Sequence, residues 1–234
     1  INIIIPIYLM FILNLKCIGN KYHMTQTSYQ DKIIEAVKGF QRCQRNFDLD
    51  KNIDNQVVEI LYDVALSTPT KQNLVNFDII VVTNRQLIRQ CAQAAVSESV
   101  DFLQVSEEIK SGRRLQNPQV DCNLLFLYVM KDNSRSPLKK HRDPGPIIKW
   151  ESYIRLVNME IGISVGALGL TANILGFKTG CCKCYNEPLL PDSVFTDNGY
   201  DKGDLMLMFG IGYPKFTKHT LHTDGTNTSD TLKK

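Results

Sequence analysis

The sequence lacks several short motifs that mark large enzyme classes. It has no H-E-x-x-H zinc motif, no G-x-x-x-x-G-K-[ST] phosphate loop and no G-x-G-x-x-G dinucleotide fingerprint. The usual signs of a zinc peptidase, a P-loop nucleotide hydrolase and a Rossmann dehydrogenase are therefore missing. The sequence has four histidines, which all lie in polar stretches typical of solvated surface: His23, His141, His219 and His222.

The chain also lacks a strong charge of either sign. Its formal net charge of +3 over 234 residues is too small to favour nucleic acid as a partner. A hydrophobic fraction of 43% and a charged fraction of 22% are ordinary for a globular protein, and the length predicts one domain. The seven cysteines, an odd number without regular spacing, indicate reduced thiols rather than a disulfide framework. We therefore expect a cytoplasmic protein.

The first 23 residues differ from the rest of the chain. Residues 1–15 are almost wholly apolar, and a polar stretch after them leads to Met24. The apolar run lacks the basic start and the cleavage site of a signal peptide, and it is short for a membrane-spanning helix. We expect residues 1–23 to lie upstream of a native start at Met24, with an N-terminal membrane anchor as the alternative. Residues 24–234 would then form a single domain, with a disordered tail after residue 223.

Hydrophobic spacing predicts alternating helices and strands. Apolar residues at helical spacing predict helices over residues 31–40, 53–66, 85–100 and 147–175. Short apolar runs predict strands over residues 78–83, over residues 122–130 and within residues 203–214. The second of these strands is apolar almost throughout, as in a strand buried on both faces. We expect Asp54 or Asn52 to cap the second helix.

The helix predicted over residues 147–175 has an apolar stripe that is long for one small core. Gly162, Gly166 and Gly169 lie within this helix. Glycine destabilises a helix interior, so its repeated use needs a reason. We expect another backbone to pack closely against these three positions.

Two segments near the start of the chain carry a basic cluster and a turn. The first, after the first predicted helix, reads Phe40-Gln41-Arg42-Cys43-Gln44-Arg45-Asn46-Phe47. The second, before a predicted strand, reads Ser67-Thr68-Pro69-Thr70-Lys71-Gln72-Asn73-Leu74-Val75-Asn76-Phe77. Arginine side chains match phosphate oxygens bidentately, so the first segment indicates a phosphate site. Together the segments resemble the R-R-S-x-R-x-F and A-P-S-x-x-N-x-Q-x-W signatures of the FMN-dependent nitroreductase family.

Two later segments resemble the same family, and they come in the family's order. The long predicted helix ends in Leu175-Gly176-Phe177-Lys178-Thr179-Gly180. The last predicted strand ends in Phe209-Gly210-Ile211-Gly212-Tyr213-Pro214, close to the family's G-x-G-Y-P. The resemblance spans residues 28–221.

The resemblance implies a set of cofactor-binding residues. Arg42, Cys43 and Arg45 would hold the phosphate and ribityl chain of FMN, with Cys43 in the place of a serine. Thr70, Lys71 and Asn73 would contact FMN from the partner subunit. Cys181, Cys182 and Lys183 would pass along the flavin ring. Lys218 would reach the phosphate, and Lys215 is the next candidate. No residue is given a catalytic role, because FMN itself carries the hydride.

The resemblance also implies the fold and the activity. The fold would be α+β, a three-layer α/β/α nitroreductase-like arrangement with a mixed, mainly antiparallel central sheet. The protein would be a homodimer with FMN at the subunit interface. It would use NAD(P)H to reduce nitro, quinone or similar conjugated acceptors by a ping-pong hydride mechanism. Basic loops at residues 110–116 and 135–143 are candidates for the walls of the substrate pocket.

Two alternatives stay open. One is a protein that binds or stores flavin without turnover. The other is a thiol or metal protein that uses Cys181, Cys182 and Cys184, because three thiols in four positions can bind a soft metal or exchange disulfides. No further cysteine pair at zinc-ligand spacing follows them, so we expect no metal site.

Overall fold

The computed structural model describes residues 29–96, 117–131 and 150–215. Residues 1–34 and 35–234 form two compact units, and helix α2, Tyr29–Phe40, begins in the first and ends in the second. All the described strands belong to the second unit. The expectations for the leader, for Lys218, for the four histidines, for the two basic loops and for the tail lie outside the described residues.

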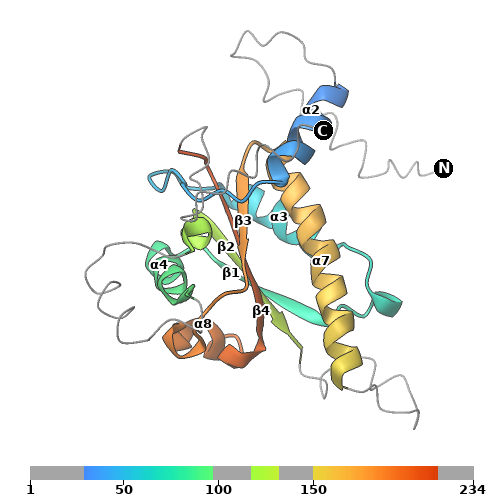
Figure 1. Cartoon of the computed structure of the whole chain (residues 1–234), viewed down its shortest axis with the longest axis vertical. Helices are drawn as coiled ribbons and strands as arrows, with labels where there is room; N and C mark the ends of the chain where they lie inside the picture. Colours follow the sequence, from blue (N-terminus) through green and yellow to red (C-terminus); the bar gives the residue numbers. More distant parts are fainter. Residues whose placement is uncertain (1–28, 97–116, 132–149, 216–234) are drawn as a thin grey trace, which may run out of the picture. The chain divides into compact units, whose positions relative to one another are not determined.

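A four-stranded sheet forms the centre of the second unit (Figure 1). Its strands lie in the order β1-β2-β4-β3, with the bounds Phe77–Val82, Leu124–Met130, Leu205–Gly212 and Lys178–Cys182. Strand β2 is buried along its whole length, which confirms the prediction of a strand covered on both faces. Every strand pair among the described residues is antiparallel, so the parallel pair that the expected mixed sheet requires is not found there.

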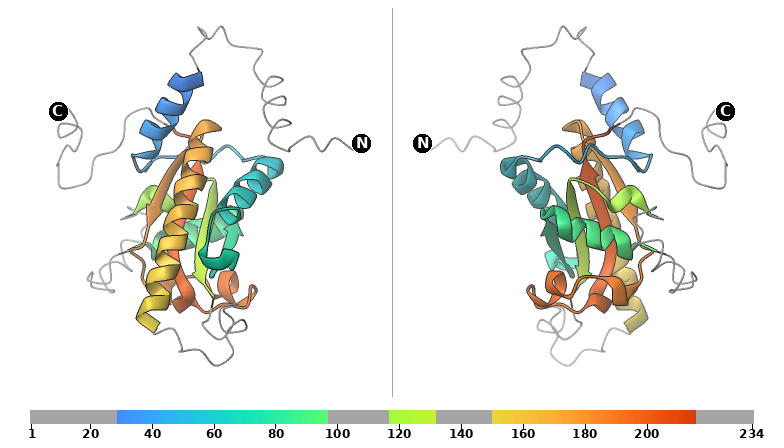
Figure 2. Two further views of the ribbon diagram at one scale, coloured as in Figure 1. Left: turned by 90° about the vertical axis from the view of Figure 1, so that its right-hand side faces the viewer. Right: turned by 90° about the vertical axis from the view of Figure 1, so that its left-hand side faces the viewer.

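Helices cover both faces of this sheet. They are α3, α4, α7 and α8, with the bounds Asn55–Leu66, Arg85–Ala94, Trp150–Ile174 and Asp192–Thr196. Successive side chains of β2 point to opposite faces: Phe126 packs in the core under α3 and α7, and Leu127 packs in the core with α4 and α8. Figure 2 shows α7 in front of the sheet in one view and α4 in front in the other. This α/β/α layering agrees with the expected fold class.

Short 3-10 turns connect these elements. They are η1, η2, η3 and η4, with the bounds Lys71–Asn73, Pro118–Val120, Glu187–Leu189 and Lys202–Asp204. Two of them, η1 and η2, hold residues of the candidate site described below.

Polar side chains fix where two of the helices begin. Asp54 caps α3, because its carboxylate accepts a hydrogen bond from the Gln56 backbone N–H at 2.8 Å. Asp54, and not Asn52, is therefore the cap. Asn84 caps α4 in the same way, accepting from the Gln86 and Leu87 backbone N–H groups.

Helix α4 ends earlier than its apolar pattern predicts. It stops at Ala94, although the pattern continues to residue 100. Its final carbonyl groups have partners from other parts of the chain: the Asn186 backbone N–H donates to the Ala94 carbonyl, and the Asn117 side chain donates to the Ala95 carbonyl, both at 2.8 Å. These tertiary hydrogen bonds replace the next helical turn.

Among the described residues, the glycines of α7 do not meet another backbone. At Gly169 an added Cβ would collide with the ring of Phe40, so a side chain, not a backbone, packs there. At Gly162 and Gly166 an added Cβ would find no atom of another described element within 4 Å. Close packing is therefore found at Gly169, against a side chain, and the expected second backbone is not found at any of the three positions in the described part of the chain.

Candidate functional site

The segment that follows α2, residues 41–47, is called the basic turn here, and it lies along the β3 edge of the sheet. The Gln44 backbone N–H donates to the Thr179 carbonyl of β3 at 2.8 Å, and the Asp48 N–H donates to the Tyr213 carbonyl at 2.8 Å. The chain between these contacts therefore follows β3 toward the end of β4. Arg42 is exposed and Arg45 is half-buried on this turn. The motif at residues 40–47 and the motif at residues 175–180, far apart in the chain, are thus in direct contact.

Glycines in two neighbouring strands let another segment approach the sheet closely. A Cβ at Gly180 would lie 2.8 Å from the Gln119 carbonyl oxygen, and a Cβ at Gly210 would lie 2.6 Å from the same oxygen. Both distances are too short for a real Cβ, so any larger residue would push η2 away from β3 and β4. This approach accounts physically for the first glycine of the Gly210-Ile211-Gly212 segment.

Gln119 is the most unusual polar residue of this region. Its side chain is 6% exposed, and its amide nitrogen lies 3.5 Å from the Cys181 carbonyl and 3.2 Å from the Asn117 side-chain oxygen. Its side-chain oxygen is buried and has no hydrogen-bond partner among the described residues. Buried polar atoms of native proteins are nearly always paired, so this acceptor marks a place where a donor belongs.

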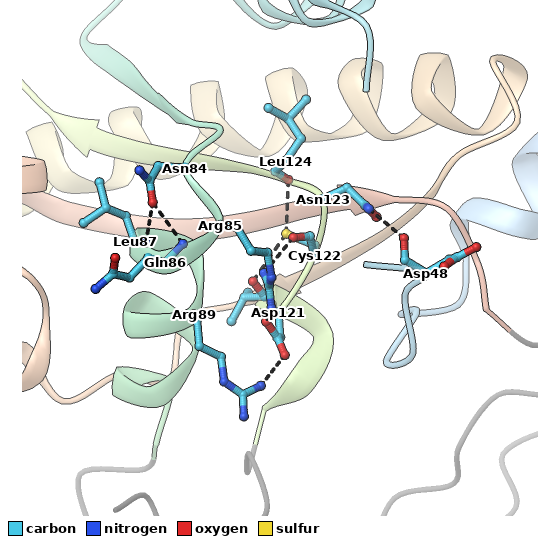
Figure 3. Close-up of polar contacts among 11 residues, drawn as sticks. Asp48, Asn84, Arg85, Gln86, Leu87, Arg89, Asp121, Cys122, Asn123 and Leu124 are labelled. Carbon is cyan, nitrogen blue, oxygen red and sulfur yellow. Dashed lines mark hydrogen bonds and ion pairs between the residues drawn. The ribbon is translucent and has the colours of Figure 1, made fainter. Parts of the chain in front are cut away.

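An ion-pair cluster holds η2 in this position (Figure 3). Arg85 and Arg89 of α4 both pair with the nearly buried carboxylate of Asp121, which follows η2 directly. Arg85 also donates to the Cys122 carbonyl at 3.0 Å. A carboxylate shared by two guanidinium groups fixes the segment more firmly than one exposed ion pair would. Gln119 therefore lies on a rigid support.

The cysteines near the end of β3 point in different directions. Cys181 is exposed and Cys182 is buried in the core that α4 covers, because successive residues of a strand face opposite sides. The Cys182 thiol donates to the Cys184 carbonyl at 3.3 Å, and burial raises the pKa of Cys182 to about 12. Within the described ranges no group of three His, Cys, Asp or Glu side chains could hold a metal ion.

The second sequence motif forms a loop that is held by a buried glutamate. Glu160 of α7 is fully buried. Its carboxylate accepts hydrogen bonds from the Lys71 backbone N–H at 2.9 Å, from the Asn76 backbone N–H at 3.1 Å and from the Asn76 side-chain amide at 3.0 and 3.2 Å. Sequence reasoning missed Glu160. The signal was available, because Glu160 is the one acidic residue on the largely apolar buried side of α7.

This loop has a strained backbone. Gln72 and Asn73 have φ of 57°, and Val75 has φ of 44°, which is unusual for a β-branched residue. Such residues cost about 1–3 kcal/mol each and persist only where the surroundings enforce them. The enforcing contacts include the Thr70 hydroxyl, which accepts from the Val75 N–H at 3.1 Å, and the Lys131 amine, which donates to the Val75 carbonyl at 3.0 Å.

The predicted site residues separate into two groups within one chain. Arg42, Cys43 and Arg45 lie with Cys181 along β3. Thr70, Lys71 and Asn73 lie in the loop that leads into β1. Strands β1 and β3 are the two edges of the sheet, so three strand spacings, or about 14 Å, separate them. A single chain does not bring the two groups together.

The individual residues differ in what they offer a ligand. Cys182 has its side chain in the core, so only its backbone is available, whereas the Lys183 side chain is exposed. The Thr70 hydroxyl is used inside its own loop, and Lys71 and Asn73 are exposed. Lys215 is exposed, and its backbone N–H donates to the Asn46 carbonyl at 3.1 Å.

One further motif has a structural role. Gly162-Ile163-Ser164-Val165-Gly166 matches the G-x-S-x-G pattern of a hydrolase nucleophile, but it lies inside α7 and not at a strand-to-helix turn. Ser164 is fully buried. Its hydroxyl donates to the Ala65 carbonyl at 2.6 Å and lies 2.9 Å from the Tyr128 hydroxyl. Ser164 thus joins α7 to α3 and β2 and is not an exposed nucleophile.

Comparison with known proteins identifies the family. The Nitroreductase family model matches residues 40–213, which is more than half of the chain, so the chain belongs to the Nitroreductase family. This confirms the resemblance drawn from the sequence. No curated protein sequence matches the chain.

Solved structures share the fold at low sequence identity. A nitroreductase with bound FMN from Desulfitobacterium hafniense is 17% identical, with a TM-score of 0.52, 82% of this chain covered and 97% of that one. The NADPH:FMN oxidoreductase from Vibrio harveyi, complexed with NAD+, is 12% identical, with a TM-score of 0.54 and coverage of 81% and 72%. Nitroreductase A from Vibrio parahaemolyticus is 14% identical, with a TM-score of 0.56 and coverage of 84% and 75%.

Proposed function

We propose that the protein is an FMN-dependent oxidoreductase that uses NAD(P)H to reduce nitro compounds, quinones or similar conjugated acceptors by a ping-pong cycle. Membership of the Nitroreductase family supports this, and one solved structure of the same fold holds FMN. The observation that carries the proposal is the contact between the basic turn and β3. It brings Arg42 and Arg45 to the segment that would pass along a flavin ring.

The residues present fit the chemistry of FMN. The phosphate needs cations, and Arg42 and Arg45 supply two guanidinium groups on one turn. The polar edge of the flavin ring needs donors and acceptors, and the unpaired buried oxygen of Gln119 is an acceptor beside β3. When bound, FMN would supply the hydride chemistry. Lys183 would add positive charge at the end of β3, which favours an anionic reduced cofactor.

The separation of the two residue groups supports a homodimer. Thr70, Lys71 and Asn73 reach the opposite edge of the sheet from the basic turn, so one site that uses both groups needs two chains. In this proposal each FMN would be held by the basic turn of one subunit and the Glu160-anchored loop of the other.

The exposed face of α7 offers a contact surface for the second subunit. Met159, Ile163 and Ile174 are 59%, 41% and 53% exposed, and Gly162 and Gly166 between them leave open space. Exposed apolar side chains beside small residues favour close packing against another helix.

A membrane is the other surface that such a helix could meet. By length and composition only, residues 151–174 are long and apolar enough to span one, and part of this helix is buried inside the protein. The exposed Arg155 and the buried Glu160 in this helix disfavour a span. We therefore propose a soluble cytoplasmic homodimer without membrane or nucleic-acid partners.

Anaerobic spectroscopy tests the proposed function. The full chain is reconstituted with FMN, freed of excess cofactor, and its visible spectrum is recorded before and after addition of NADH or NADPH. We expect a bound flavin spectrum that bleaches with at least one nucleotide. The Arg42→Ala, Arg45→Ala double variant should bind FMN far more weakly. Lys202→Ala, which removes the cation of η4 that pairs with Asp192 of α8, should not weaken FMN binding.

The outcomes distinguish the alternatives. A bound flavin that neither nucleotide reduces would support the storage protein. No retained flavin after reconstitution, or retention of FAD in preference to FMN, would overturn the proposal.

A further inference from the structure

Two cysteines that are 138 positions apart in the chain lie side by side at the edge of the sheet. The Cys181 backbone N–H donates to the Cys43 sulfur at 3.4 Å, and the Cys43 thiol donates to the Cys181 carbonyl at 3.8 Å. The neighbouring Cys43 side chain is also the largest cause of the raised pKa of Cys181. Sequence spacing alone does not indicate this pair.

The surrounding backbone holds the two cysteines next to each other. Gln44, next to Cys43, donates its backbone N–H to the Thr179 carbonyl of β3 at 2.8 Å, so the chain around Cys43 is fixed beside the strand that carries Cys181. The Cys43 sulfur already lies against the Cys181 backbone. A disulfide bond joins neighbouring cysteines whose Cα atoms lie about 4.4–6.8 Å apart, so this pair is a candidate for one.

The two thiols are accessible and chemically unequal. Cys181 is exposed and Cys43 is half-buried. The neighbouring Cys43 thiol and partial burial raise the pKa of Cys181, so Cys181 keeps its proton longer. The Cys43 sulfur accepts a hydrogen bond from the Cys181 backbone N–H. Cys43 is therefore the better nucleophile of the pair.

We propose that Cys43 and Cys181 form a redox-active dithiol that reduces low-molecular-weight disulfides. The Cys43 thiolate attacks one sulfur of the disulfide RSSR, forming a Cys43–SR bond and releasing RS⁻. Cys181 then gives up its proton and attacks the Cys43 sulfur, forming the Cys43–Cys181 disulfide and releasing the second RS⁻. The protein loses two thiol protons and two electrons, and RSSR gains both to become two RSH. The reaction needs no flavin, and FMN bound against the same two residues would slow it.

A second pair of cysteines competes with Cys43 and Cys181 as the candidate dithiol. Cys181 and Cys184 have the C-x-x-C spacing of redox motifs. However, Cys184 follows the end of β3, and its carbonyl accepts a hydrogen bond from the Cys182 thiol at 3.3 Å, whereas the Cys43 sulfur contacts the Cys181 backbone. Cys182 is buried in the core that α4 covers, so a dissolved disulfide does not reach its thiol.

Treatment of the full chain with glutathione disulfide tests the proposal. The remaining thiols are blocked with maleimide, and the protein is digested with trypsin without reduction. Trypsin cuts after Arg42, Arg45, Lys178 and Lys183. We expect residues 43–45 to be linked to residues 179–183, with two of the seven thiols lost and the mass of the chain lowered by about 2 Da. The same link in a Cys182→Ser variant would assign it to Cys181.

Single variants give the matched controls. Cys43→Ser should abolish the link. Cys181→Ser should instead hold a persistent glutathione on Cys43, because no second thiol can displace it. Cys184→Ser should form the link as the unchanged chain does. Far-ultraviolet circular dichroism checks that each variant folds. The Cys43–Cys181 link is measured first in the unchanged chain, so the main test does not depend on whether a variant folds.

Three results would overturn the proposal. They are a persistent glutathione on Cys43 in the unchanged chain, a disulfide that joins Cys184 to Cys181 or to Cys182, and retention of all seven thiols after treatment.

Discussion

Replacing Glu160 by glutamine should loosen the loop that we assign to the partner's flavin site. The substitution keeps the shape of the side chain but replaces one acceptor oxygen by an amide that donates. Each carboxylate oxygen now accepts two hydrogen bonds, one from a backbone N–H of the loop and one from the Asn76 side chain. Whichever oxygen is replaced, a backbone N–H of Lys71 or Asn76 therefore faces another donor.

The size of the effect follows from burial. Glu160 is fully buried, and a buried donor that loses its acceptor costs about 1–3 kcal/mol. The loop also contains three residues with positive φ, whose strain these hydrogen bonds oppose. Because about 1.4 kcal/mol corresponds to a factor of ten, local opening of the loop should rise roughly five- to one-hundred-fold.

Hydrogen exchange with site resolution measures this opening directly. The Lys71 and Asn76 amides should exchange faster in Glu160→Gln, and urea unfolding should show a lower free energy of unfolding. Glu59→Gln, at an exposed position of α3, is the matched control and should change stability by less than about 0.5 kcal/mol. Unchanged exchange at both amides in a folded Glu160→Gln protein would refute the assignment of Glu160 as the anchor of the loop.

Three other predictions concern the interface, the site and the start of the chain. Gly166→Leu, which meets open space in one chain, should leave a folded monomer that has lost FMN; light scattering and absorbance on one sample check this, and an FMN-loaded dimer would contradict it. Bound FMN should slow maleimide labelling of Cys43 and Cys181 but not of Cys184, measured by peptide mass spectrometry, and equal slowing at all three would contradict the proposed site. A protein that begins at Met24 should be soluble, dimeric and FMN-loaded in gel filtration, and aggregation relieved only by restoring residues 1–23 in detergent would show that they form an anchor.

Much of the fold could be predicted from apolar spacing, because burial dictates the pattern. The seven apolar residues of β2 and the long stripe of α7 are examples. Strand β3 could not be found in this way. Its sequence, Lys178-Thr179-Gly180-Cys181-Cys182, is short and partly polar and contains a glycine, since one side of the strand meets η2 and the basic turn instead of a helix.

The candidate site was only partly accessible to sequence reasoning. Arg42 and Arg45 could be proposed from the sequence because basic residues on a turn are common phosphate ligands. Gln119 gives no sequence signal, since its significance depends on burial without a partner. The contact between Cys43 and Cys181 depends on tertiary packing across 138 positions, which no local pattern encodes.

A mixed dimer tests whether each FMN site uses the basic turn of one subunit and the loop of the other, as we propose. Two chains with different tags are co-expressed, one with Arg42→Ala and Arg45→Ala and the other with Lys71→Ala and Asn73→Ala, and the doubly tagged dimers are purified. We expect that neither variant homodimer retains FMN, whereas the mixed dimer, with one intact site, retains one FMN that NAD(P)H reduces. A mixed dimer without FMN, while the unchanged protein binds it, would contradict the shared site, because it would show that each site is built from a single chain.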